Sequence, residues 1–290
     1  MNVPASLEVP ERVGVLGGGR MGAGIAHAFL IAGSDVVVVE RSTADADAAR
    51  ARIKKAVDAG IERGVVGIDR AEVLARLKTG ADAALFVDRD LVVEAVPEDR
   101  ALKVDALRRV AAEVTADAAI ATNTSSISIG ALAADLDLPE RFVGMHFFNP
   151  VPASALVEIV VGDATSNRLV EAAQGWVSAL GKTAVTVRDA PGFASSRLGV
   201  SLGLEAIRML EDGVASAADI DAAMTLGYKH PVGPLRLTDI VGLDVRLGIA
   251  EYLHTDLGPR FEPPALLRTM VAAGKLGRKS GEGFYTWEKQ

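Results

Sequence analysis

The chain has 290 residues, of which 49% are hydrophobic and 24% are charged, and its formal net charge is −7. This length and composition are typical of a soluble globular protein with two domains, and they exclude three classes of protein or site. There is no basic stripe for nucleic acid, no apolar run long enough to span a membrane, and no cysteine for disulfides or thiolate chemistry. The first residues lack the features of a secretory signal, so we expect a cytoplasmic location.

Apolar strands and amphipathic helices alternate over the first two thirds of the chain. Strands are predicted at 13–16, 35–40, 90–96, 119–121, 142–148, 155–161 and 184–187, and those at 35–40 and 90–96 have the continuous apolar runs of strands buried on both faces. Helices are predicted at 21–32, 44–64, 69–77, 98–114 and 167–180. This alternation predicts an α/β fold, a Rossmann-type doubly wound parallel sheet with room for antiparallel strands at one edge.

The pattern changes at Asp189, beyond which the sequence reads as helical. Helices are predicted at 195–212, from Ser216 onward, at 235–257 and at 265–273. We therefore place a domain boundary near Asp189, between a sheet domain of residues 1–189 and an all-α domain of residues 190–290.

The stretch VGVLGGGRMGAGIA has the spacing G-x-G-x-x-G at Gly17, Gly19 and Gly22, after a predicted strand and at the start of a predicted helix. Such glycines permit a tight turn, the approach of a pyrophosphate, and close packing of helix on sheet. The next strand ends in Glu40, whose carboxylate suits ribose hydroxyls and repels a 2′-phosphate. These features predict NAD as the cofactor, although Arg41 beside Glu40 could soften the preference against NADP.

Three polar residues near strand ends suit hydride chemistry on an alcohol. His146 could act as a general base, Glu158 on the following strand could hold its imidazole, and Ser125 could bind the substrate oxygen. Other interpretations remain open, because a strand histidine is often a structural core residue and Ser125 or Ser126 could cap a helix. The four histidines lack metal-ligand spacing, so no metal site is expected.

Six blocks in order, DLVVEAVPEDRALK, ATNTSSISI, GMHFFNPVPASALVEIV, DAPGFASSRL, GPLRLTDIVGLD and GKLGRKSGEGFY, resemble the 3-hydroxyacyl-CoA dehydrogenase family, most closely its bacterial 3-hydroxybutyryl-CoA dehydrogenases. The resemblance implies oxidation of an (S)-3-hydroxyacyl-CoA by NAD, or the reverse reduction, within fatty acid metabolism. It implies that His146 is the general base, Glu158 its partner and Ser125 the residue that holds the substrate oxygen.

The resemblance also implies two sets of binding residues. The cofactor site would be lined by Gly17, Gly19, Gly22, Glu40, Glu98, Lys103, Ser125, Asn149 and Lys279. Lys54 and Arg63, in the basic helices after Glu40, would bind the CoA end of the substrate. The alternative for Lys103 and Lys279 is a solvated surface charge, and the alternative for Lys54 and Arg63 is an ordinary charged helix face.

One block departs from the family, because Ser196–Arg197 stands where an Asn-Arg pair is usual. One interpretation is that Ser196 remains in the substrate pocket and leaves extra room there, and the alternative is that a sub-group of the family uses serine with no consequence. Leu198, Leu202 and Ile207 form an apolar face that predicts a homodimer through the helical domain. Two other functions stay open: a dehydrogenase of a free hydroxy acid of the gulonate type, and an NAD-binding protein without catalysis.

Overall fold

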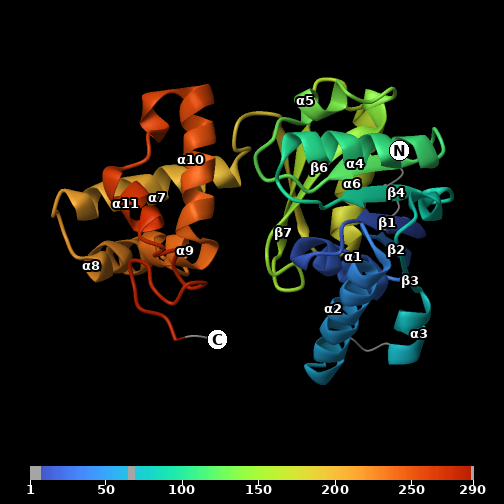
Figure 1. Cartoon of the computed structure of the whole chain (residues 1–290), viewed down its shortest axis with the longest axis horizontal. Coiled ribbons are helices and arrows are strands. Elements are labelled where there is room, and N and C mark those ends of the chain that lie inside the picture. Colours follow the sequence, from blue (N-terminus) through green and yellow to red (C-terminus); the bar gives the residue numbers. More distant parts are fainter. Residues whose placement is uncertain (1–7, 65–68, 289–290) are drawn as a thin grey trace, which may run out of the picture. The chain divides into compact units, whose positions relative to one another are not determined.

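The computed structural model describes residues 8–64 and 69–288. The chain divides between Asp189 and Ala190 into two compact units, of which the first is built on a sheet and the second consists of helices (Figure 1). Each unit is described by itself below.

The first unit contains one eight-stranded sheet and its helices. The strands are β1 (Arg12–Leu16), β2 (Asp35–Val39), β3 (Leu77–Gly80), β4 (Leu91–Glu94), β5 (Ala119–Thr122), β6 (Phe142–Phe147), β7 (Leu156–Val161) and β8 (Thr183–Arg188). The α-helices are α1 (Arg20–Ile31), α2 (Thr43–Glu62), α3 (Arg70–Ala75), α4 (Arg100–Glu113), α5 (Ile129–Ala133) and α6 (Asn167–Ala179).

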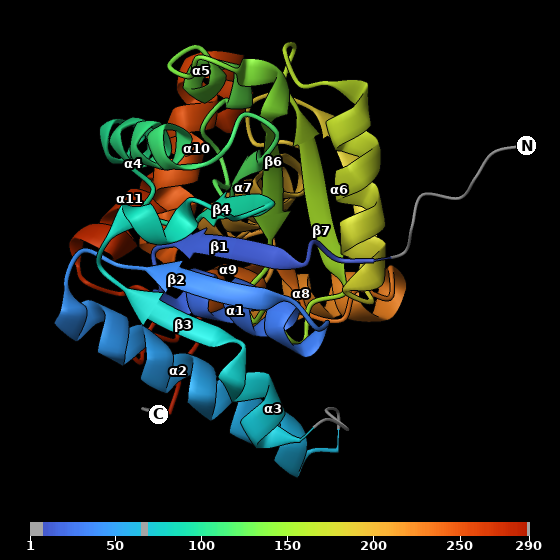
Figure 2. The ribbon, with the colours of Figure 1, turned by 90° about the vertical axis from the view of Figure 1, so that its right-hand side faces the viewer.

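The strand order is β3-β2-β1-β4-β5-β6-β7-β8. Strands β1 to β6 are paired in parallel, β7 is antiparallel to β6, and β8 is parallel to β7. Figure 2 shows β1, β2 and β3 side by side. The predicted doubly wound α/β fold, with antiparallel strands at one edge, is confirmed.

One strand was wrongly predicted as part of a helix. The helix predicted at 69–77 ends at Ala75, and Leu77 already begins β3. Its sequence LKTG has neither an apolar run nor β-branched alternation, because β3 is an edge strand that pairs only with β2.

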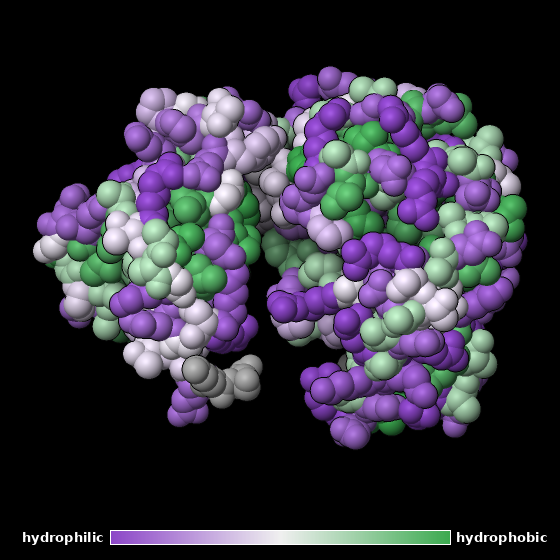
Figure 3. Space-filling model, viewed as in Figure 1, coloured by the Kyte–Doolittle hydropathy of each residue, from purple (hydrophilic) through white to green (hydrophobic). Residues whose placement is uncertain are grey.

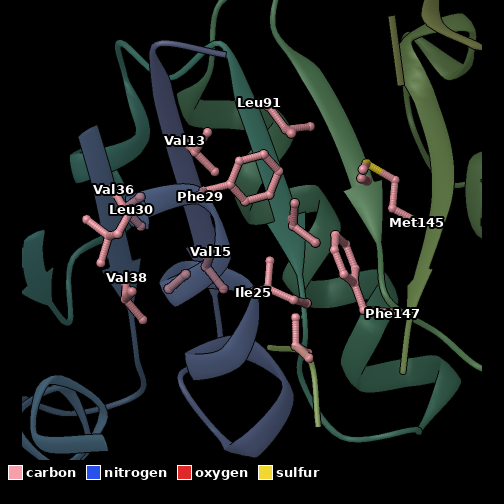
Figure 4. Packing of buried hydrophobic residues seen from close by; sticks show 14 of the residues in the cluster. Val13, Val15, Ile25, Phe29, Leu30, Val36, Val38, Leu91, Met145 and Phe147 are labelled. Carbon is pink, nitrogen blue, oxygen red and sulfur yellow. The ribbon is translucent and has the colours of Figure 1, made fainter. Parts of the chain in front are cut away.

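The larger core of this unit lies on one face of the sheet. Alternate strand residues such as Val13 and Val15 pack there against Ile25 and Phe29 of α1, and all four are fully buried (Figure 4). Helices α4 and α5 contact strands β4, β5 and β6. Strands β1, β2 and β4 to β7 are buried along most of their length, and their sequences are largely apolar, whereas β8 is mostly exposed.

The second unit consists of α7 (Ser195–Glu211), α8 (Ala217–Ala222), α9 (Pro234–Val241), α10 (Leu243–Leu257) and α11 (Ala265–Ala272). The single helix predicted at 235–257 is wrong, because α9 and α10 are separate helices. Gly242 divides them with a φ of 108°, a conformation that an L side chain rarely adopts. An apolar periodicity that continues across the break conceals it in the sequence.

The segment after α11 is fastened to a buried carboxylate on α9. Asp239 is fully buried and accepts hydrogen bonds from the backbone N–H groups of Phe284 and Tyr285, both at 2.9 Å, and from Nε1 of Trp287 at 2.8 Å. A Cβ built at Gly283 would lie 2.2 Å from Oδ1 of Asp239, so the chain passes this carboxylate too closely for a side chain there.

The apolar face predicted for dimerisation is only partly exposed. Leu198 is 70% exposed, whereas Ile207 is completely buried in the core of its own unit. The inclusion of Ile207 in an outward face was therefore wrong: it lies on the core side of α7, with Val200 and Leu204. In the described part of the chain, no helix is long and apolar enough to cross a membrane.

Candidate active site

The glycine loop between β1 and α1 fits a pyrophosphate. Gly17 has a φ of 92°, and a Cβ built at Gly22 would lie 1.8 Å from the carbonyl oxygen of Gly17, so both positions require glycine. A Cβ built at Gly19 would meet nothing within 4 Å, which leaves open space beside the loop. Gly19 is the N-cap of α1 and makes no side-chain hydrogen bond, so no side chain caps the N-terminal end of this helix, where an anion would bind.

Glu40 lies directly beside this loop. Its Oε1 accepts a hydrogen bond of 2.6 Å from the backbone N–H of Gly18. A Cβ built at Gly18 would lie 2.3 Å from that of Ala49 on α2, so a third consecutive glycine is also required, which the motif alone did not indicate. The carboxylate thus stands at the end of β2, where an adenosine ribose would be recognised.

His146 and Glu158 are paired by the register of two strands. They are direct partners across the antiparallel strands β6 and β7, and Nδ1 of His146 lies 2.8 Å from Oε2 of Glu158. Both side chains are buried, at 8% and 0% exposure. The ring of Phe148 lies 4.5 Å from the imidazole between centroids. A carboxylate at Nδ1 fixes the tautomer in which Nε2 carries the lone pair, so Nε2 is the nitrogen that can accept a proton.

Ser125 is held by Glu98 in the turn after β5. Oε1 of Glu98 accepts hydrogen bonds from the backbone N–H of Ser125 at 2.9 Å and from its hydroxyl at 3.3 Å. The same oxygen accepts hydrogen bonds from Thr124 and Ser126. Burial raises the pKa of Glu98, but the charge of Lys103 and these hydrogen bonds outweigh burial and leave the pKa below its usual value.

Lys103 is the centre of a buried charge network. Its side chain is 1% exposed, so the interpretation as a solvated surface charge is wrong. Nζ lies 2.8 Å and 3.1 Å from the two oxygens of Glu94 and 3.4 Å from Oε2 of Glu98. Glu94, at 0% exposure, also accepts a hydrogen bond of 2.6 Å from the hydroxyl of Thr122. Glu94 and Thr122 were missed in the sequence, although a carboxylate within the apolar strand LVVE signals a buried partner.

The two cations expected to bind CoA lie on or next to α2, whose visible face is covered by hydrophilic residues (Figure 3). Lys54 is exposed on this helix. Arg63 follows its last turn, and Nε of Arg63 donates to the carbonyl of Ala59 at 2.9 Å. This hydrogen bond gives Arg63 a role at the C-terminal end of α2. Binding of CoA by Lys54 and Arg63 stays a prediction.

The remaining expected site residues are dispersed. Asn149 is exposed just after β6, at the cis peptide bond to Pro150. Ser196 lies in the first turn of α7, and Lys279 forms an ion pair of 2.5 Å with Asp244 in the second unit. Since Ser196 and Lys279 belong to the second unit, only the residues of the first unit are brought together here.

The first unit thus has a dinucleotide loop, a carboxylate for a ribose and a histidine–carboxylate pair. The open space at Gly19 and the uncapped helix end are the features that a bound NAD would use. Among the described residues, no group of three histidine, cysteine or acidic side chains could hold a metal ion.

Comparison with protein families matches both units. The NAD-binding domain model of 3-hydroxyacyl-CoA dehydrogenase matches residues 12–190, and the model of its C-terminal domain matches residues 192–287.

Similar proteins cover nearly the whole chain. A probable 3-hydroxybutyryl-CoA dehydrogenase of Deinococcus radiodurans is 42% identical over 95% of this chain and 100% of its own. A 3-hydroxybutyryl-CoA dehydrogenase of Mycobacterium tuberculosis is 43% identical over 96% of this chain and 98% of its own. The crystal structure of (S)-3-hydroxybutyryl-CoA dehydrogenase PaaH1 from Ralstonia eutropha matches with a TM-score of 0.92 and 41% identity, covering 97% of this chain and 100% of that one.

Proposed function

The chain belongs to the 3-hydroxyacyl-CoA dehydrogenase family, and we propose that it interconverts (S)-3-hydroxybutyryl-CoA and acetoacetyl-CoA. It is an NAD-dependent oxidoreductase. The observation that carries the proposed chemistry is the buried contact of 2.8 Å between His146 and Glu158. A purely structural NAD-binding protein has no need for a histidine–carboxylate pair at this end of the sheet.

In the proposed oxidation, Nε2 of His146 removes the proton of the 3-hydroxyl group. Glu158 holds the ring through Nδ1 and stabilises the imidazolium that forms, because the two groups are buried together. When bound, NAD would accept a hydride from the carbon that bears this hydroxyl group. In the reverse direction, the protonated His146 returns its proton to the oxygen of the ketone.

Ser125 is proposed to donate a hydrogen bond to the substrate oxygen. Its backbone is fixed by Glu98, and Glu98 is fixed in turn by Lys103. We assign Lys103, with Glu94, a positioning role for the Ser125 turn, since the nearest groups to its ammonium are these carboxylates.

The other binding roles complete the proposal. Besides the glycine loop, Glu40, Glu98, Asn149 and Lys279 are proposed to contact NAD, and Ser196 the acyl group. Lys54 and Arg63 are proposed to bind the CoA phosphates, and the second unit to form a homodimer. A cytoplasmic location stays a prediction from the sequence.

The test is oxidation of NADH with acetoacetyl-CoA, followed at 340 nm. We expect turnover by the parent protein and a fall in kcat by a factor of about 10² to 10⁴ in His146→Gln, the usual range for loss of a general base. Combining it with Glu158→Gln should cost less than the product of the single effects, because the two residues act as a unit.

Free hydroxy acids of the gulonate type are the control substrates. Turnover with them but not with acetoacetyl-CoA would overturn the proposed substrate. A His146→Gln variant within a few-fold of the parent would overturn the assigned base, and unchanged binding of NAD would show that the variant remains folded.

A further inference from the structure

An asparagine side chain replaces the backbone as hydrogen-bond partner where β5 and β6 separate. The parallel pairing of these two strands ends at Thr122 and Gly144. Asn123 is the next residue, and its backbone N–H donates to the carbonyl of Glu94 on β4 at 2.8 Å. Its side-chain oxygen, Oδ1, accepts a hydrogen bond of 2.9 Å from the backbone N–H of Phe147 on β6. The side chain of Asn123 therefore holds the end of β6 beyond the last backbone pair.

The amide group of Asn123 has a defined orientation. A backbone N–H can only donate, so the group that faces Phe147 is the amide oxygen and not the NH2 group. Phe147 is 2% exposed, and its ring belongs to the same core as Ile25 of α1 (Figure 4). Phe147 is thus fixed at two points, by its ring in the core and by its N–H at Asn123.

This doubly fixed residue directly follows His146. Because side chains alternate along a strand, His146 faces the opposite side of β6 from Met145 and Phe147, which both belong to the core. The β6 backbone at His146 is paired with that of Glu158 on β7. The end of β6 that presents the imidazole is therefore held by β7 on one side and by the amide of Asn123 on the other.

Asn123 also begins the turn that contains Ser125. Glu98 fixes the backbone N–H and the hydroxyl of Ser125 in this turn. Oδ1 of Asn123 thus joins the turn of the proposed oxygen-binding serine to the strand of the proposed base. Both groups must reach one oxygen atom of the substrate, and a misplacement of about 1 Å in such an arrangement can lower the rate about a hundredfold.

We propose that Asn123 is a positioning residue, whose Oδ1 sets the separation between the proposed base and Ser125. This inference rests on the proposed function, because it takes His146 as the base and Ser125 as the residue that binds the substrate oxygen. The side chain acts as an acceptor in this role, and its NH2 group is not required. A residue of similar size without an acceptor should therefore slow the chemical step, whereas a residue with an oxygen in the same place should not.

The test compares Asn123→Leu, which removes the acceptor, with Asn123→Asp, which keeps an oxygen and removes the NH2 group. NADH oxidation with acetoacetyl-CoA is measured, and kcat is expressed per NADH-binding site, counted by fluorescence titration, so that misfolded protein does not contribute. We expect kcat to fall about 10- to 100-fold in Asn123→Leu and to stay within about threefold of the parent in Asn123→Asp. KM for acetoacetyl-CoA should change by less than about threefold in both, because the lost interaction serves the transition state.

A double variant separates positioning from a general effect on stability. If Asn123 acts through the base, adding Asn123→Leu to His146→Gln should lower kcat per site by less than about a further threefold, because the two residues act as a unit. Gln174→Ala is the matched control in the same unit. The amide of Gln174 donates to the hydroxyl of Thr186 on β8 at 2.8 Å, and its loss should leave kcat per site unchanged.

Three results would overturn the positioning role. Parental kcat per site in Asn123→Leu, or the full product of the single effects in the double variant, would show a structural role only. An equal loss in Asn123→Asp would show that the NH2 group is the one that matters. If Asn123→Leu binds no NADH, Asn123→Ala takes its place in the same comparison, because it also lacks the acceptor and adds no bulk. A parent protein that reduces no acetoacetyl-CoA would instead contradict the proposed function.

Discussion

Each unit contains a buried cation, and the two cations differ in whether a carboxylate compensates their charge. Lys103 lies within 3.4 Å of two carboxylates, Glu94 and Glu98, and the whole cluster also receives hydrogen bonds from the turn that holds Ser125. Arg246 is almost equally buried, yet no carboxylate that the structure describes is paired with it.

The difference separates a cation whose charge is compensated within the fold from one that is buried without a countercharge. A fully compensated charge is stabilised by its partners within the fold, and removing one residue of such a charge cluster leaves the other charges buried and unpaired. An uncompensated buried charge destabilises the fold. The same substitution, cation to methionine, should therefore have opposite effects on stability in the two units.

The largest effect is expected at Lys103. Lys103→Met leaves Glu94 buried without its countercharge, so we expect the free energy of unfolding to fall by about 3–5 kcal/mol. Urea titration at pH 7 measures this change, and kcat should fall as well because the Ser125 turn loses its anchor. Lys78→Met on β3 is the control, because that exposed lysine should change stability by about 0.5 kcal/mol or less.

Equal stability of Lys103→Met and Lys78→Met would contradict the idea that the Lys103 charge stabilises the fold, and the contrast with Arg246 would fail. The double variant Glu94→Gln, Lys103→Met tests whether the loss of stability comes from the unpaired Glu94 carboxylate. The double variant removes the stranded carboxylate, so it should recover part of the lost stability.

A smaller effect of opposite sign is expected at Arg246. Arg246→Met replaces an unpaired buried guanidinium with an apolar side chain of similar length, so we expect the protein to be more stable by about 1 kcal/mol or more. Thermal unfolding without ligand measures it as a rise of Tm by a few degrees. A fall in Tm would mean that Arg246 has a structural partner after all, and the contrast with Lys103 would disappear.

The smallest effect concerns acid stability of the Lys103 cluster. The pKa of Glu98 is lower in the folded protein than in the unfolded chain, so its contribution to stability is complete above the unfolded value, about 4.3, and is lost as the pH falls through the folded value. Between pH 5 and pH 3 the parent should lose more stability than Glu98→Gln does. The effect is limited because the Glu98 side chain is 37% exposed, and parallel pH profiles for the two proteins would contradict it.

Sequence patterns predicted the features that depend on local spacing. The glycine loop and Glu40 could be placed because G-x-G-x-x-G has a fixed relation to one strand and one helix. The pairing of His146 with Glu158 could be expected because a short loop joins two strands, although their direct register needed the structure.

Features that depend on distant partners were not predictable. Lys103 sits in a helix rich in charged residues, and only the fold shows that its face is covered and that Glu94 meets it. Arg246 likewise resembles one charge of a solvated helix face, because nothing in GLDVRLGIA reveals that α7 lies over it with two glycines. The break at Gly242 was hidden because glycine also occurs inside helices, and the required φ is visible only in the structure.

The fastening of residues 284–287 to Asp239 limits how this protein can be cut or fused. A truncation before Phe284 would leave the fully buried Asp239 without the three N–H donors that now satisfy it. A recombinant boundary drawn at the end of α11 would therefore remove the donors and the cover of this carboxylate together, and we expect it to destabilise the helical unit. A tag or a fused domain joined after Trp287 keeps this anchor intact and is the safer choice for engineering.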